Sequence, residues 1–169
     1  MEPQFIQPNN LRYTERPLPE YRHLPFTNAH PFLDKEGHSY GEKLSPADSF
    51  SAENWQNCSE YLYSIDLFNH GFWWEAHERL KYMSIGAGRE SETGQFVQGL
   101  IQIAAALLKH FMQEDSGAAT LAELGSGNLR GVADVYLGID VPILMTQVQD
   151  CLKTEGSKYP QIHLAIVQE

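Results

Sequence analysis

The sequence predicts an all-α fold: a single domain of about five helices, preceded by an irregular, proline-rich N-terminal arm. Seven of the nine prolines lie within residues 1–50, and prolines at this density forbid long helices. After residue 50, apolar residues recur at helical spacing in successive segments that are separated by glycine-containing turns. A chain of 169 residues is most simply one domain, and it can bury enough surface to fold without a disulfide or a structural metal.

The arm, residues 1–50, is too apolar to be a free tail. Segments that stay disordered are poor in large apolar side chains, whereas this one carries them throughout its length: Phe5, Ile6, Leu11, Tyr13, Leu18, Tyr21, Leu24, Phe26, Phe32, Leu33 and Tyr40. We therefore expect an ordered arm that packs on a helical domain formed by residues 51–169.

The first two helices are predicted from apolar stripes and from their end signals. The first is expected to begin near Ser51, a suitable N-cap, and to end before Gly71, which can adopt the left-handed cap conformation, with His70 exposed at the turn. The second is expected to run from about Phe72 to Met83. Its predicted buried face consists of four residues at helical spacing: Trp73, Ala76, Leu80 and Met83.

The third helix, from about Glu92 to Gln113, is predicted to be the central one. Its apolar residues cover more of its circumference than a one-sided stripe, so neighbours should contact it on several faces. Gln98 and Gln102 lie one turn apart within it. Because an unpaired buried amide costs about 1–3 kcal/mol, these glutamines either tether neighbouring helices or form the floor of a site.

Two more helices complete the prediction. The fourth spans about Ala118 to Leu129 and is expected to be interrupted at Gly125-Ser126-Gly127. The fifth is capped by Asp140, has Pro142 in its first turn, and ends near Gly156. The apolar tail at residues 162–167 is expected to pack back on the helices, either extended or as a short strand.

The charge of the chain narrows the class of partner. Twelve basic and 22 acidic residues give a formal net charge of −10, and no basic stripe of the kind that nucleic-acid-binding proteins show is present. The same charge disfavours anionic membrane surfaces, and the apolar run of the central helix is too short to span a bilayer. The expected partner is a small molecule or another protein.

The cysteines and the N-terminus favour a cytoplasmic location. Cys58 and Cys151 are far apart and outside any CxxC spacing, which is typical of reduced residues in a cytosolic protein. The first residues lack the basic and apolar regions of a signal peptide.

The most informative segment is Trp73-Trp74-Glu75-Ala76-His77-Glu78. Aromatic bulk around a histidine and a carboxylate is what a shaped polar pocket needs, and it is also found at an ordinary core edge. The surrounding pattern is Phe68-Asn-x-Gly71-Phe-Trp-x-x-Ala76-His77-Glu78, followed by Phe96-x-x-Gly99-Leu100-Ile101-Gln102. From about Tyr61 to Leu124 the chain resembles a prokaryotic family catalogued as domain of unknown function 309.

The resemblance implies a small all-helical protein with a histidine-based, metal-linked signature. That signature is a histidine, a glutamate four residues later and an aromatic residue three beyond that, and its histidine matches His77. Here the following positions hold Lys81 and Ser84 instead. Residues at i and i+4 share a helix face, so Lys81 would repel a cation that His77 bound.

Two sets of candidate site residues follow. A ligand pocket is predicted around His77, with further contributions from Trp74, Glu78, Lys81, Gln102 and His110. A divalent-metal site would use His77 and Glu78, joined by arm histidines: His30 and His38 lie in two short turns of the arm that could fold over this pocket. The alternative, which histidines in loops generally favour, is that both arm histidines are ordinary loop residues bonded to backbone or water.

Three functions fit these residues. The first is binding of a small ligand at the His77 pocket, where Lys81 would favour a carboxylate or phosphate group. The second is binding of a divalent metal, with metal-dependent hydrolysis as its extension. The third is a homo-oligomeric interaction module, such as a homodimer, with Trp73 and Trp74 as interface anchors. The sequence does not decide whether the protein is an enzyme.

Overall fold

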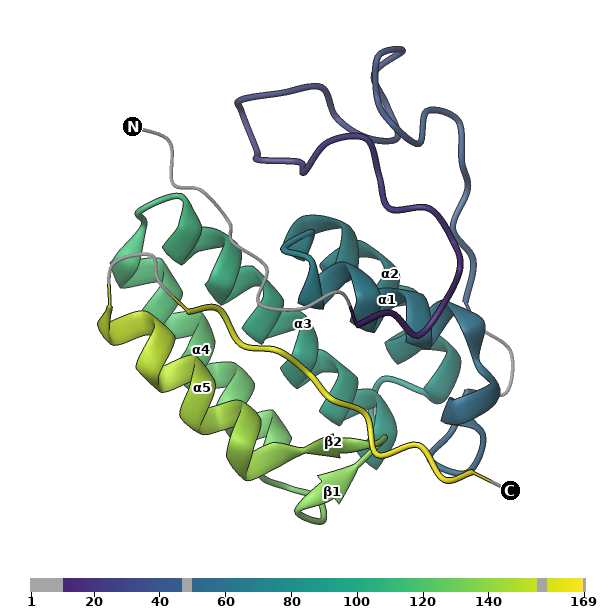
Figure 1. The fold of residues 1–169 in the computed structure, drawn as a ribbon, viewed down its shortest axis with the longest axis vertical. Helices are drawn as coiled ribbons and strands as arrows, with labels where there is room; N and C mark the ends of the chain where they lie inside the picture. Colours follow the sequence, from purple (N-terminus) through teal and green to yellow (C-terminus); the bar gives the residue numbers. More distant parts are fainter. Residues whose placement is uncertain (1–10, 47–49, 155–157, 169) are drawn as a thin grey trace.

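The computed structural model describes residues 11–46, 50–154 and 158–168, and over these the all-α prediction is confirmed (Figure 1). Parts of the predicted arm (1–10 and 47–49) and the predicted end of the last helix near Gly156 lie outside the described residues. The five α-helices are α1 (Ser59–Asn69), α2 (Trp73–Ala87), α3 (Glu92–Phe111), α4 (Asp115–Leu129) and α5 (Val141–Lys153). A 3₁₀-helix (Trp55–Asn57) precedes α1, and the antiparallel strands β1 (Val135–Tyr136) and β2 (Ile139–Asp140) precede α5.

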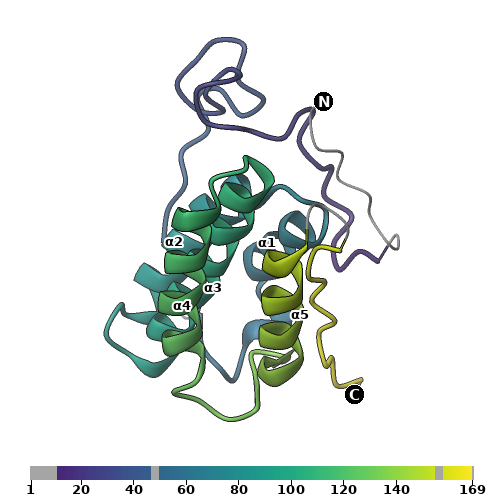
Figure 2. The same cartoon turned by 90° about the vertical axis from the view of Figure 1, so that its left-hand side faces the viewer.

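The helices form two layers, with the arm above one end of both (Figure 2). Helices α2, α3 and α4 lie side by side in one layer, and α1 and α5 form the other. Seven side chains of α3 are at most 1% exposed: Phe96, Val97, Leu100, Ile103, Ala104, Ala106 and Leu107. The prediction that this helix is central is therefore confirmed.

Helix α4 is continuous, so the predicted interruption at residues 125–127 is wrong. The glycines serve close helix packing instead. A Cβ atom at Gly99 of α3 would lie 3.0 Å from the carbonyl oxygen of Gly125, and one at Gly125 would lie 3.0 Å from the carbonyl oxygen of Gly99. Only residues without a side chain allow the two backbones to approach this closely.

Several helix ends follow the sequence signals. The Asp140 side chain accepts a hydrogen bond from the Ile143 N–H at 3.0 Å, which confirms this residue as the cap of α5. Gly71 has φ of 79° directly after α1, as predicted. Ser51, in contrast, does not begin α1: its N–H donates to Asn54 Oδ1 at 2.8 Å. That turn leads into the 3₁₀-helix, and the α-helix starts only at Ser59.

His70 is buried, and its predicted exposure is wrong. The arm crosses the end of α1, where the His70 Nε2 atom lies 3.2 Å from the carbonyl oxygen of Leu11. Burial lowers the pKa of His70, although the hydrogen bond to Leu11 opposes the shift. A sequence-local reading of the turn could not anticipate cover from a segment almost 60 positions earlier.

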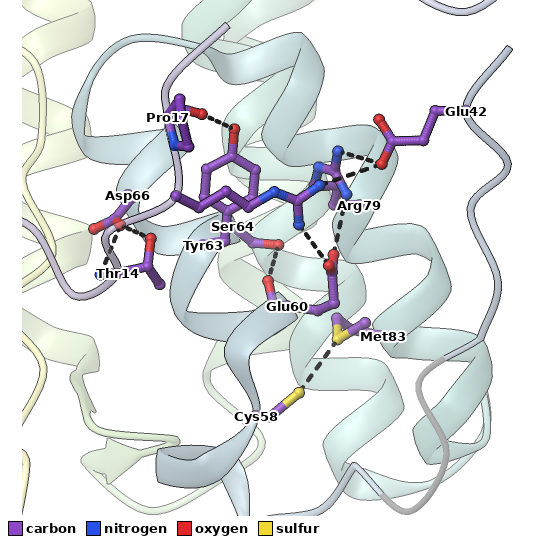
Figure 3. Close-up of polar contacts among 11 residues, drawn as sticks. Thr14, Pro17, Glu42, Cys58, Glu60, Tyr63, Ser64, Asp66, Arg79 and Met83 are labelled. Carbon is purple, nitrogen blue, oxygen red and sulfur yellow. Dashed lines mark hydrogen bonds and ion pairs between the residues drawn. The ribbon is translucent and has the colours of Figure 1, made fainter. Parts of the chain in front are cut away.

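The arm is attached to α1 through Asp66, whose side chain is fully buried. Its carboxylate accepts hydrogen bonds from the Tyr13 N–H at 2.7 Å and from the Thr14 N–H and hydroxyl at 3.0 and 2.6 Å. Arg12 Nε lies 3.0 Å from the same carboxylate. Figure 3 shows Thr14 against Asp66 on the outer side of α1. Since two of the donors are backbone N–H groups, the contact fixes the path of the arm.

The C-terminal tail packs back in extended form, which is one of the two predicted arrangements. Asn69 pairs with the backbone of Ile162: its Oδ1 accepts at 2.7 Å and its Nδ2 donates at 2.8 Å. The tail also meets the arm, because the Leu164 N–H donates to the Tyr13 hydroxyl at 2.8 Å. Among the described residues, no helix is long and apolar enough to cross a membrane.

We predict that Asp66→Asn destabilises the protein by about 3–5 kcal/mol, the usual cost of breaking a buried ion pair. The amide places an N–H₂ group against one of the arm donors and removes the charge that Arg12 faces. Urea unfolding measures the loss. The control is Asp150→Asn on the exposed face of α5, which should change the free energy of unfolding by less than about 0.5 kcal/mol. Equal effects of the two substitutions would contradict the role of Asp66.

Stability should also depend on pH through His70. Its folded-state pKa is lowered below the ordinary 6.5, so the unfolded chain binds more protons and stability falls as the pH drops through 6.5. His70→Gln keeps an N–H donor for Leu11 but does not titrate. As the pH is lowered from 7.5 to 5.5, the free energy of unfolding of the wild type should therefore fall relative to that of His70→Gln. A pH-independent difference would refute the prediction.

Candidate functional site

His77 and Trp74 line a cavity of about 240 Å³ between α2, α3 and the arm. Its walls are mainly apolar, with ionisable groups at His77, Lys109 and Glu114; the full lining is Pro25, Phe26, Trp74, His77, Ala105, Leu108, Lys109, Met112 and Glu114. Of the six residues predicted to form a ligand pocket, two, Trp74 and His77, line this cavity.

Helical spacing explains how two helices present these side chains together. Trp74 and His77 are three residues apart on α2, and Ala105, Leu108 and Met112 follow one face of α3 at intervals of three and four. The arm contributes Pro25 and Phe26 to the lining, from a turn in which the Thr27 N–H donates to the Leu24 carbonyl at 3.1 Å. Within this turn Phe26 has φ of 69°, and its side chain is fully exposed.

The His77 imidazole lies close to the carboxylate of its neighbour on the helix, Glu78. Its Nδ1 atom is buried and lies 3.3 Å from Glu78 Oε1, with no well-formed hydrogen bond among the described residues. Glu78 Oε1 also accepts from Lys81 Nζ at 2.9 Å. Burial acts to raise the pKa of Glu78, but His77 and Lys81 together outweigh it, and the pKa is lowered. Glu78 is therefore a carboxylate near neutral pH.

Arm side chains pack around the Trp74 ring. His23 and His30 meet it edge-on, with ring centroids 4.6 and 5.2 Å away, and Phe32 lies at 5.9 Å. His30 therefore folds toward the tryptophan of the predicted site. Its Nδ1 atom accepts from the N–H groups of Phe32 and Leu33, both at 3.2 Å.

Three other predicted ligand residues have partners that are not in the cavity lining. Lys81 pairs with Glu78, and its side chain is 44% exposed. Gln102 Oε1 accepts from Asn128 Nδ2 at 2.7 Å, so this amide ties α3 to α4. His110 Nε2 lies 3.1 Å from the carbonyl oxygen of Thr154, at the far end of α5. Gln102 therefore acts as a tether between helices, which is one of the two roles expected for it, and His110 contacts the end of α5.

The residues proposed as metal ligands are not gathered in one place. His38 pairs with Glu75, at 2.8 Å between Nε2 and Oε2, whereas His77 faces Glu78. Within the described ranges, no group of three or more His, Cys, Asp or Glu side chains could hold a metal ion.

Sequence reasoning missed two buried ionisable residues of α2, Glu75 and Arg79, which are 4% and 6% exposed. An acid and a base one turn apart beside an apolar stripe is the signal that could have revealed them. It was ambiguous, because the same spacing occurs in exposed helical ion pairs.

Comparison with known proteins identifies one family and no curated relative. No curated protein matches the chain. Residues 61–121 match the model of the family described as "Domain of unknown function (DUF309)". This segment contains almost all of α1, the whole of α2 and α3, and the first half of α4. The family resemblance that the sequence suggested is thereby confirmed: over residues 61–121, the helices that carry His77 and the cavity, the chain matches the DUF309 family.

Proposed function

We propose that the protein binds a small, flat, largely apolar molecule with an O–H or N–H donor in the His77 cavity. The observation that carries this proposal is a concavity with mostly apolar walls whose lining includes one imidazole, that of His77, and one indole ring, that of Trp74. Small-molecule sites combine apolar walls with few polar groups that fix the ligand's orientation. At about 240 Å³ this cavity suits a single substituted ring rather than an extended cofactor.

The expected tautomer of His77 sets the polarity of the ligand. Because Nδ1 faces the ionised Glu78 at 3.3 Å, the neutral ring is most stable with its proton on Nδ1, and Nε2 is then an acceptor. The Nδ1 atom is buried, whereas the side chain as a whole is 28% exposed and lines the cavity, so we infer that Nε2 is the ring nitrogen that meets the ligand. An acceptor selects a ligand hydroxyl or N–H group.

The charges near the cavity favour a neutral ligand. Lys109 Nζ is paired with Glu114 Oε2 at 2.7 Å, and Lys81 with Glu78 at 2.9 Å. With both ammonium groups neutralised, the carboxylate or phosphate ligand expected from Lys81 has less support than a phenol-like one.

The other two expected functions have weaker support. The candidate metal ligands are divided between the Glu75 and Glu78 pairs. As an interface anchor Trp73 is unsuitable, because it is completely buried. Among the described residues of the arm, the exposed large apolar side chains are instead Phe26, Leu33 and Tyr40.

A matched pair of probes tests the proposal. p-Cresol and 4-methylanisole share a ring, but only the first has an O–H donor. We predict that p-cresol binds more tightly by about 3–10-fold, the worth of one net hydrogen bond, and that His77→Ala abolishes the preference. Trp74→Ala should lower the affinity for both probes, because it removes the indole ring from the cavity wall. Ligand-observed NMR measures the affinities, and His163→Ala, which removes an exposed histidine of the tail, is the control.

Either of two results would refute the proposal: neither probe binds the wild type, or the preference for p-cresol survives in His77→Ala. An equal loss in His163→Ala would show that the probes bind elsewhere.

A further inference from the structure

A second cavity, of about 290 Å³, lies between the arm and helices α1 and α2. Unlike the His77 cavity it is strongly polar: its lining includes Arg16, His38, Glu42, Tyr63, Glu75 and Arg79. Apolar side chains of the arm, among them Leu18 and Phe32, form another part of its wall. Phe32 also contacts Trp74, so the aromatic cluster of the arm separates the two cavities.

Glu75 is the deepest charged group of this second cavity, and only part of its carboxylate is satisfied. Oε2 accepts from His38 Nε2 at 2.8 Å and from the His23 N–H at 3.1 Å. Oε1 is buried and has no hydrogen-bond partner in the part of the chain that the structure describes. An unsatisfied buried acceptor is unfavourable, so a cation beside this carboxylate would offset a cost that is present in the free protein.

Two guanidinium groups in the same cavity are held in place by two carboxylates. Arg79 lies 2.9 Å from Glu42 and 3.1 Å from Glu60, and Arg16 bridges the same two residues at 3.2 and 2.6 Å. Figure 3 shows the Arg79 side chain between Glu42 and Glu60. The guanidinium groups of Arg16 and Arg79 lie over the Tyr63 ring, 4.3 and 5.1 Å from its centroid, respectively. Each guanidinium has five N–H donors, so these pairs leave donors for a further acceptor.

The spacing of Glu75 and Arg79 defines the shape of a suitable ligand. The two residues are one turn apart on α2, so their side chains emerge about 5–6 Å apart on one face. A cation at Glu75 and an anion at Arg79 must therefore be close to each other in the ligand. The ammonium and carboxylate groups of an α-amino acid have this relation.

Charge balance also favours a ligand that carries both signs. Arg16 and Arg79 are matched by Glu42 and Glu60, as the closed set of ion pairs shows. A lone amine would meet the two guanidinium groups, and a lone carboxylate would meet Glu75 and Glu42, each without compensation. A zwitterion gives the carboxylates an additional cation, gives the guanidinium groups an additional anion, and adds no net charge.

We propose that this polar cavity binds a free α-amino acid, whose ammonium group pairs with the Glu75 carboxylate and whose carboxylate accepts from Arg79 and Arg16. The apolar walls at Leu18 and Phe32 select an aliphatic side chain of moderate size. The site is separate from the His77 cavity, and its existence does not depend on the function proposed there.

Three probes that share one carbon skeleton test the site by isothermal titration calorimetry. L-Leucine carries both charged groups, 3-methylbutylamine lacks the carboxylate, and 4-methylpentanoate lacks the ammonium. We expect leucine to bind at least about 10-fold more tightly than either analogue, since each analogue loses a charge-assisted hydrogen bond. Comparable affinity for leucine and either analogue, or no binding of leucine, would overturn the proposal.

Two variants locate the binding on the protein. Glu75→Gln removes the negative charge that pairs with the ammonium group, at nearly constant side-chain size. It should lower the affinity for leucine by about 10-fold or more. Glu78→Gln, a carboxylate change on the same helix but outside this cavity, is the matched control and should leave leucine binding unchanged. If folded Glu75→Gln bound leucine as tightly as the wild type, the assignment of the binding site to this cavity would be wrong. If Glu75→Gln does not give a cooperative thermal transition, Arg79→Lys replaces it and should lower affinity for leucine but not for 3-methylbutylamine.

Discussion

A carboxylate that is buried in a helix needs hydrogen-bond donors, and in this protein the arm supplies them. Asp66 of α1 and Glu75 of α2 are both nearly inaccessible to solvent, and both accept from backbone N–H groups of the arm: Tyr13 and Thr14 in one case, His23 in the other. Without these donors each carboxylate would be buried and poorly satisfied, at a cost of several kcal/mol. The helices and the arm therefore depend on each other for stability.

This dependence explains why both cavities have the arm as one wall. Helix α2 contributes the ring of Trp74 and the imidazole of His77 to the first cavity, α3 contributes Ala105 and Leu108, and a turn of the arm completes the lining. In the second, Glu75 and Arg79 of α2 face the arm residues Arg16, His38 and Glu42. The family match covers residues 61–121, so it includes the helical half of each cavity and none of the arm.

The sequence predicted features that depend on local chemistry. The four apolar residues expected to form the inner face of α2 are at most 1% exposed, and the Asp140 cap was readable from side-chain type and position. Features that depend on distant contacts were not predictable in this way. The cover over His70 comes from Leu11, the partner of Glu75 is His38, and Gly125 stays helical because it packs on Gly99. For the candidate site, Trp74 and His77 could be identified because they share a helix face, whereas Gln102 and His110 turn toward α4 and α5.

Hydrogen–deuterium exchange followed by NMR tests most directly whether the arm is an integral part of the fold. Our account predicts that the amides of Tyr13, Thr14 and His23, which donate to buried carboxylates, exchange at least about 100-fold more slowly than their unfolded-chain rates. The amides of Lys35 and Glu36, in an exposed turn of the same arm, should exchange close to those rates. If Tyr13, Thr14 and His23 exchanged as fast as Lys35 and Glu36, the arm would not be held by Asp66 and Glu75, and neither cavity would have the wall described here.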